Sequence, residues 1–296
     1  MLLTRSRTAI VLAALLFSTG GAVIKGSELS AWWISVGRSA IAAAVILAIL
    51  PESRRLGSPR VWLAGVAYAA TLVTFAFATK LTTAAAAIWL QATGPLYMLV
   101  LAPPLLGERV RPRDVALGLV LLAAMVALFL DARHGATTTL APRPLLGNVL
   151  GAVSGLTFAL TVLALRHRAQ DGQASSLPVV VAGNLLACAA TLPPALASSA
   201  DGASPSAADV AVVLYLGCVQ VGLAYRLLDW GIRRVPAFEA SALLLVEPAT
   251  NPLWAWLATG ESPSWLAAIG GVVIITATFV HAALAVRRVS VSPDTT

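Results

Sequence analysis

Ten long apolar stretches, separated by short clusters of charged and turn-forming residues, limit most strongly what this chain can fold into. A helix needs about 20 apolar residues to cross the hydrocarbon layer of a membrane. Only 11% of the residues are charged, against about 25% in soluble domains. We therefore predict an all-α integral membrane protein with ten transmembrane helices. The predicted spans are Thr8–Ile24, Ala31–Leu50, Val61–Thr79, Thr83–Leu106, Val115–Leu130, Leu146–Leu165, Leu177–Ala197, Val210–Trp230, Ala237–Ala258 and Trp265–Val286.

The positions of the basic residues predict how the chain is oriented. Lys and Arg gather in the cytoplasmic loops of membrane proteins. If the N-terminus is cytoplasmic, the opposite side receives few of the loop cations, namely Lys25, Lys80, Arg133 and Arg143. We therefore expect a multi-pass protein of a bacterial-type cytoplasmic (inner) membrane, with both termini cytoplasmic. This topology also accounts for the net charge of +7, so no nucleic-acid partner is predicted.

The two halves of the chain match each other at a constant offset. Pro95 corresponds to Pro248, and Glu108 corresponds to Glu261. Each half holds five predicted spans, so equivalent elements are expected to cross the membrane in opposite directions. Inverted repeats of this kind recur in secondary transporters, whose substrate site lies between the repeats near the midplane. The predicted divisions are residues 1–135 for the first repeat, 136–145 for an extracytoplasmic linker, 146–288 for the second repeat and 289–296 for a cytoplasmic tail.

These features resemble the EamA-type branch of the drug/metabolite transporter superfamily. The resemblance implies two inverted five-helix repeats around a central cavity, and export of amino acids or other small metabolites. One departure is that the first copy, Gln91-Ala92-Thr93-Gly94-Pro95, has no acidic residue before its proline. The resemblance is carried by Val36-Gly37-Arg38-Ser39-Ala40, Pro95, Leu105-Leu106-Gly107-Glu108-Arg109, Val246-Glu247-Pro248, Gly260-Glu261 and Gly270-Gly271.

Charged residues inside the spans are the sharpest functional candidates, since a charge at the centre of a transmembrane helix costs about 2.5–3.5 kcal/mol on insertion scales. Arg38 can bind a substrate carboxylate through its forked donors. Alternatively, it can pair with Glu247 or with backbone carbonyls, or extend to the interface. Glu247 can bind a cation or exchange a proton, or it can be a permanently paired structural carboxylate. Asn184 occupies the position in the second half that is equivalent to Arg38, which supports a cavity-facing position in both copies.

Other charged residues favour structural roles. Arg226 and Asp229 are three residues apart on one helical face, so we predict a local structural pair. Glu108 and Glu261 end the fourth and ninth spans and are predicted to lie at the membrane interface. Arg109 is one of several arginines beside Glu108, which favours a solvated loop network there.

Prolines within the spans predict paired helix breaks. Pro95 and Pro248 each remove a helical hydrogen bond, at matching places in the two halves. Gly94 and Pro252 weaken the same regions. Such paired breaks point to the binding site and hinges of a transporter, although neighbouring helices can also satisfy a simple kink.

Several uncharged residues are further candidates for contact with substrate. Trp89 and Tyr97 lie in a span near the first break, where they can contact an organic substrate or pack against lipid. Gln91 is the polar side chain beside the same break. Gly147, Gly151 and Gly155 form a small-residue stripe, for which we predict close helix packing.

Missing motifs exclude some classes of function. The sequence has no phosphate-binding loop and no hydrolase or metalloprotease motif, so we predict no enzyme, no cofactor and no metal site. The primary hypothesis is a secondary transporter that exports amino acids or related metabolites by alternating access. The alternatives are multidrug or organic-cation efflux on the same fold, and a non-transporting membrane protein. The expected partners are a small-molecule substrate and membrane lipid, and the residues leave open whether a proton is coupled.

Overall fold

The chain has 296 residues, and its structure is a computed structural model. The structure describes residues 2–107, 110–134, 137–170, 175–198, 206–232, 234–235 and 237–289. The predictions made for Glu108 and Arg109 therefore lie outside the described residues. Throughout the described ranges the regular structure is helical, and no strand occurs in them. This agrees with the all-α class predicted from the sequence.

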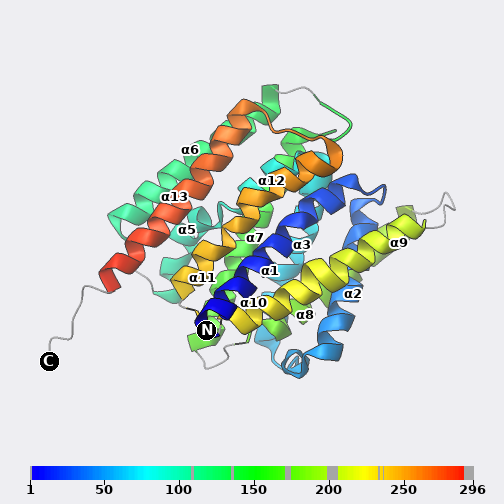
Figure 1. Cartoon of the computed structure of the whole chain (residues 1–296), viewed down its shortest axis with the longest axis horizontal. Coiled ribbons are helices and arrows are strands. Elements are labelled where there is room, and N and C mark those ends of the chain that lie inside the picture. Colours follow the sequence, from blue (N-terminus) through cyan, green and yellow to red (C-terminus); the bar gives the residue numbers. More distant parts are fainter. Residues whose placement is uncertain are drawn as a thin grey trace.

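The first half of the chain forms a set of long helices, seen from blue to green in Figure 1. Their starts follow local chemistry. Ser30 and Thr83 accept backbone N–H groups as N-caps, and proline stands in the first turn of two other helices. The elements are α1 (Leu2–Gly26), α2 (Ala31–Ile49), η1 (Pro51–Arg54), α3 (Pro59–Leu81), α4 (Ala84–Gln91), α5 (Gly94–Leu106) and α6 (Pro112–His134).

The second half repeats this order with one irregularity. The predicted eighth span includes a π-helical segment between two α-helical ones. The sequence did not predict this segment, and π-helical turns occur frequently at functional sites. The elements are α7 (Pro144–Gln170), α8 (Leu177–Ser198), α9 (Ala207–Leu214), η2 (Tyr215–Leu223), α10 (Ala224–Ile232), α11 (Ala237–Leu244), α12 (Val246–Thr259) and α13 (Trp265–Val289).

The helices confirm a multi-pass membrane protein but do not establish all ten predicted spans. In the described part of the chain, eight helical segments are long and apolar enough to cross a membrane, and the apolar stretch Trp265–His281 is shorter. The predicted ninth span, which consists of α11 and α12, is not among these eight segments. The opposite orientation of the two halves stays a prediction.

The fourth and ninth predicted spans are both discontinuous. The fourth span divides between α4 and α5 at Ala92 and Thr93, and the ninth span divides between α11 and α12 at Leu245. Proline has no N–H to offer the carbonyl four residues earlier, and each break lies just before Pro95 or Pro248. Hydrogen bonds of the tighter 3₁₀ type span both breaks. The backbone N–H groups of Thr93 and Leu245 each donate over 3.2 Å to the carbonyl three residues earlier.

The two halves are interleaved rather than side by side. Helix α1 packs against α12 and α10 of the second half, α2 packs against α8, and α3 packs against α7 and α8. Helices α6 and α13 lie together at one edge (Figure 1). Helix pairs drawn from both halves therefore surround the centre of the molecule.

The glycine stripe on α7 has the predicted packing role. A Cβ atom at Gly151 would lie 3.1 Å from Cβ of Leu90, and one at Gly155 would lie 2.7 Å from the Leu90 carbonyl oxygen. Only residues without side chains allow α7 to approach α4 this closely. The stripe therefore holds α7 against the helix that leads into the first break.

Candidate functional site

Arg38 is buried where α2 faces α3. Arg38 is 2% exposed, and its Nη2 donates a hydrogen bond of 2.9 Å to the backbone carbonyl of Leu72 on α3. Among the described residues, Nε has no partner. The structure thus shows the backbone-carbonyl contact that was one of the alternatives for Arg38, and it leaves part of the guanidinium fork unused.

Glu247 lies in the first turn of α12, directly after the break at Leu245. Its residue is only half-buried. Within the described ranges, no ion pair joins it to Arg38 or to any other cation. The ion pair that was one alternative for the two charges is therefore not formed among the described residues, and the Glu247 carboxylate stands half-buried beside the second break.

Two tyrosines, one from each half of the chain, pack against each other. The Tyr68 hydroxyl on α3 interacts with the side chains of Tyr225 on α10 and Asn184 on α8. The rings of Tyr68 and Tyr225 meet edge to face with their centroids 6.0 Å apart. Each half of the chain therefore contributes one tyrosine to the same buried contact.

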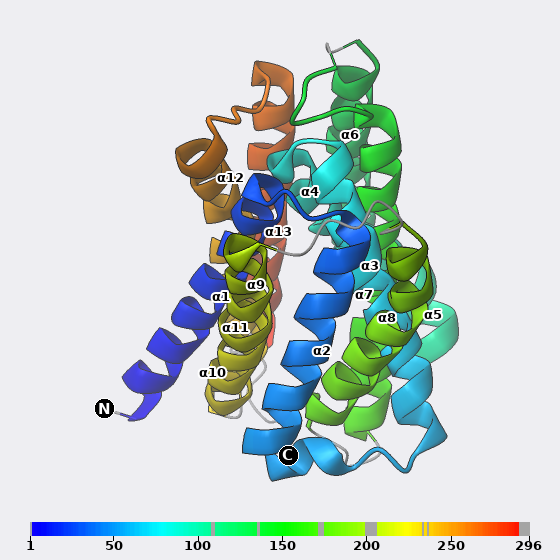
Figure 2. The same ribbon diagram turned by 90° about the vertical axis from the view of Figure 1, so that its right-hand side faces the viewer.

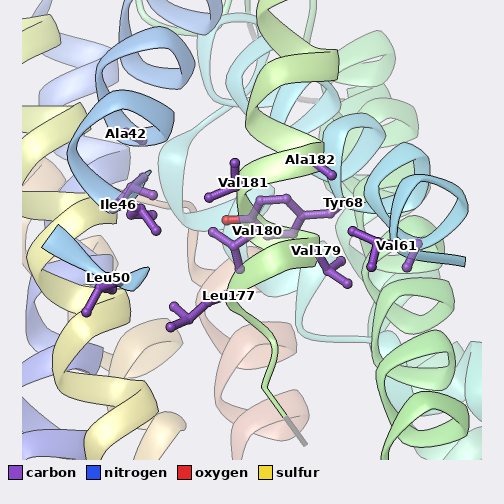
Figure 3. Packing of buried hydrophobic residues seen from close by; sticks show 12 residues of the cluster. Ala42, Ile46, Leu50, Val61, Tyr68, Leu177, Val179, Val180, Val181 and Ala182 are labelled. Carbon is purple, nitrogen blue, oxygen red and sulfur yellow. The ribbon is translucent and has the colours of Figure 1, made fainter. Parts of the chain in front are cut away.

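Figure 3 shows how the apolar surroundings direct Tyr68. The hydroxyl points past Val180 and Val181 of α8 towards Ile46 of α2, and away from Val61. Tyr68 is 4% exposed within this cluster. A buried tyrosine hydroxyl usually finds a hydrogen-bond partner, so the position of Tyr68 fixes where polar groups must converge.

Asn184 completes the cluster from the second half. It is 0% exposed, and its Nδ2 donates over 2.8 Å to the carbonyl of Val180 one turn earlier on α8. Its Oδ1 has no hydrogen-bond partner among the described side chains and backbone groups. A buried acceptor left unused costs free energy, which is unusual unless it serves a ligand or a second conformation. We call Arg38, Tyr68, Asn184, Tyr225 and Glu247 the central cluster.

Sequence reasoning identified Arg38, Asn184 and Glu247 but missed both tyrosines. A signal was present, because Tyr68 and Tyr225 each stand inside an apolar span, where a hydroxyl needs a partner. The sequence could not show that α3 and α10 bring the two hydroxyls together.

The predicted aromatic candidates use their polar atoms away from the central cluster. Trp89 is 5% exposed, and its Nε1 donates over 3.2 Å to the carbonyl of Pro248. That carbonyl lacks its helical donor because the residue four positions later is Pro252. Tyr97 directs its hydroxyl to Sδ of Met125 on α6, at 3.8 Å. Gln91 is half-buried at the end of α4.

The residues predicted to break or bend the helices differ in what they do. Gly94 and Pro95 begin α5 directly after the first break, and Pro248 follows the second break within the first turn of α12. Pro252 does not divide α12, which continues through it to Thr259. The Trp89 contact to Pro248 connects the helix before the first break with the helix after the second. Whether these places act as hinges stays a prediction.

Arg226 and Asp229 lie on α10 beside a second polar region. Asp229 is buried and Arg226 is exposed. Both line a cavity of about 300 Å³ between α10, the end of α2 and the start of α8. The local pair predicted for them stays a prediction. The other lining residues are Ile49, Leu50, Pro51, Glu52, Leu177, Trp230 and Arg234.

Glu261 was predicted at the membrane interface, but its side chain is enclosed by protein. Glu261 is 6% exposed and Lys25 is 7% exposed. Lys25 Nζ lies 3.5 Å from Glu261 Oε2, so the two form a buried ion pair. Sequence analysis had assigned Lys25 only to a loop.

These observations define the class of protein: a multi-pass helical membrane protein in which two discontinuous helices meet buried polar side chains near the centre, an arrangement typical of transporters. The model of the EamA-like transporter family matches residues 6–130 and again residues 145–282. The chain belongs to this family and is a membrane transporter, as the sequence motifs predicted.

The remaining comparisons concern the fold alone. A solved structure titled "Crystal structure of protein" is 24% identical to the chain and superposes with a TM-score of 0.61. The match covers 96% of this chain and 98% of the other. No curated protein matches the chain.

Proposed function

We propose that this protein is a secondary transporter that exports amino acids or related small metabolites across the cytoplasmic membrane by alternating access. The observation that carries the proposal is the state of Glu247, a half-buried carboxylate beside a helix break with no ion-pair partner among the described residues. A charge kept inside a membrane protein without a partner is costly unless it serves the transported solute. An ammonium group is the simplest solute group that Glu247 would bind.

The rest of the central cluster suits the other end of an amino acid. A carboxylate would meet the hydroxyls of Tyr68 and Tyr225, with Arg38 behind them as a fixed positive charge. One guanidinium nitrogen is already used by the Leu72 carbonyl. The remaining N–H groups of the guanidinium can still donate hydrogen bonds, and its positive charge still attracts a carboxylate. A zwitterion would therefore bind with its ammonium group at Glu247 and its carboxylate towards Arg38.

The movement that would carry the solute follows from the breaks. Each break leaves a short helix on either side of a turn in the backbone, and Glu247 stands just after one of them. Rocking of the two halves about these points would expose the central cluster to each side in turn. In this proposal residues 1–135 and 146–288 act as inverted units, joined by 136–145, with both termini cytoplasmic.

Organic-cation efflux is the second candidate, and one observation favours it. Arg38 is almost completely buried and bonded to backbone, which suits a structural role. In that case Glu247 alone would attract the cation. The two candidates make opposite predictions for the removal of the Arg38 charge.

A counterflow screen in proteoliposomes tests the proposal. The purified protein is reconstituted alone and assayed with amino acids, organic cations and sugars, with and without a pH gradient. Arg38→Gln should abolish amino-acid exchange if amino acids are the substrates, whereas under the alternative it should spare exchange of cations. Arg133→Gln, at an exposed position near the end of α6, is the matched control.

Two outcomes would contradict the proposal. If no solute of any class exchanges in vesicles that contain folded protein, the transporter assignment by alternating access is wrong. If Arg38→Gln leaves amino-acid exchange unchanged, the role assigned to the guanidinium is wrong.

A further inference from the structure

The Lys25–Glu261 pair lies at one end of the bundle. The short helix η1, which follows α2, lies at the opposite end (Figure 2). Figure 2 shows the end of α1 gathered with α4 and α12 at the upper end, while α2 runs down to the opposite end. Lys25 is the next-to-last residue of α1. Its charge is therefore placed where helices of both halves meet.

The backbone acceptors around Lys25 come from two other parts of the chain. Nζ donates over 2.7 Å to the carbonyl of Thr79, near the end of α3, and also to the carbonyls of Thr82 and Leu140. Thr82 lies in the α3–α4 turn and Leu140 in the segment between the halves. The ammonium group thus ties the end of α1 to the α3–α4 turn and to the connecting segment.

Glu261 connects the same place to the second half. It lies in the loop between α12 and α13. Its Oε1 accepts a hydrogen bond of 2.6 Å from the backbone N–H of Ala84, the first residue of α4. A carboxylate is favourable at a helix N-terminus, where backbone N–H groups are unpaired. The side chain therefore holds α4, the helix that leads into the first break, as well as Lys25.

The surrounding polar contacts extend this connection across the end of the bundle. Thr82 Oγ1 donates over 2.8 Å to Asn148 Oδ1 on α7, and Asn148 Nδ2 donates over 2.8 Å to the carbonyl of Leu128 on α6. All these groups are buried. The two halves cannot separate at this end without exposing the ion pair.

On the basis of the function proposed above, we propose that Lys25 and Glu261 are positioning residues that form a latch, which holds this end of the transport pathway closed and breaks when the pathway opens there. The pair joins both halves and is shielded from water. Through Glu261 it also binds the first turn of α4, the helix that precedes the first break. Removal of one partner leaves the other charge buried without compensation, which strongly destabilises a buried pair. The closed end should therefore lose its stability when either residue is neutralised.

Thiol labelling in nanodiscs, where both faces are accessible, tests the latch without any substrate. The background carries alanine at Cys188 and Cys218. A reporter cysteine replaces Ala84 at the latch, and a second replaces Ser53 at the opposite end. Both native residues are 0% exposed. Each reporter is examined with Glu261→Gln, Lys25→Met and the double variant, and with Glu28→Gln, at an exposed position in the α1–α2 loop, as control.

The latch predicts that either single neutralisation raises labelling at position 84 several-fold and leaves labelling at position 53 unchanged or lower. The double variant should label no faster than the faster single variant, since two residues of one contact are not additive. Glu28→Gln should behave as wild type.

Two results would overturn the latch. Unchanged labelling at position 84 in both single variants would show that the pair does not control access. A parallel rise at positions 84 and 53 would indicate general loosening of the fold. Neither result depends on transport, so a failure of the proposed function in the counterflow screen would be seen separately.

Discussion

Lys25 with Glu261, and Arg38 with Glu247, each combine a cation of the first half with a carboxylate of the second, and the two sets are built in opposite ways. Lys25 and Glu261 lie 3.5 Å apart with their side chains enclosed. Lys25 Nζ also donates to a backbone carbonyl and Glu261 Oε1 accepts from a backbone N–H, whereas Oε2 has no hydrogen bond among the described residues beyond its ion pair with Lys25. Arg38 and Glu247 form no ion pair within the described residues, and Glu247 is half-buried with no cation beside it. A satisfied pair suits a contact that holds helices together, whereas a separated pair suits a solute that completes it.

The largest expected effect tests the separated pair. Glu247→Gln removes the half-buried charge while keeping the shape, so exchange of any amine-bearing substrate should fall by about 100-fold, which corresponds to about 2.7 kcal/mol. Charge-assisted hydrogen bonds are worth about 1.5–3 kcal/mol. Initial rates of counterflow at matched protein content give the measurement. Equal rates for this variant and wild type would remove Glu247 from the substrate site.

The next effect tests the satisfied pair. Lys25→Met leaves the enclosed carboxylate of Glu261 without its cation, and loss of one partner of a buried pair costs about 3–5 kcal/mol. The thermal midpoint in detergent should therefore fall clearly. Lys80→Met is the control at the same end, since Lys80 is only half-buried and donates to the backbone carbonyl of Ser27. If both variants melted at the same temperature, the two regions would not differ as described.

A smaller effect concerns the packing that supports the first break. Gly155→Ala would place Cβ 2.7 Å from the Leu90 carbonyl oxygen, and overpacking of this kind costs about 1–3 kcal/mol. Gly94→Ala serves as control, because its nearest neighbour, Cδ1 of Phe158, would lie 3.6 Å from the new Cβ. Thermal stability should fall more for Gly155→Ala. The opposite order would contradict the close contact of α7 with the helix break.

The smallest effect concerns the contact that joins the two breaks. Trp89→Phe removes one hydrogen bond, to the Pro248 carbonyl, and such a bond contributes about 0.5–1.5 kcal/mol. We expect a small loss of thermal stability and a measurable change in counterflow rate. The control is Trp62→Phe, because the Nε1 of Trp62 also donates to a backbone carbonyl, that of Leu56, but at an exposed position. If the counterflow rate changes no more in Trp89→Phe than in Trp62→Phe, Trp89 has a packing role only.

The parts of the molecule that depend on local chemistry were predictable from the sequence. Pro95 and Pro248 predicted both helix breaks, because a missing N–H is visible in one residue. The packing of Gly151 and Gly155 followed from their spacing on one helical face. Likewise, the family was identified from short motifs in the two halves.

The parts that depend on distant contacts were not predictable. Tyr68 and Tyr225 become a pair only because α3 and α10 approach each other, and Lys25 meets Glu261 only after the whole chain has folded. The sequence also gave no reason for Trp89 to donate to Pro248. That contact requires α4 and α12 to be neighbours, which no local pattern encodes.

Binding of a radiolabelled substrate to the purified protein compares the two pairs most directly. The substrate is the solute with the fastest counterflow, and wild type is measured beside Glu247→Gln and Glu261→Gln. We predict that Glu247→Gln loses saturable binding, whereas Glu261→Gln binds with an affinity within a few-fold of wild type. Full binding by Glu247→Gln, or loss of binding confined to Glu261→Gln, would contradict the central claim that the separated pair holds the solute and the satisfied pair holds the helices.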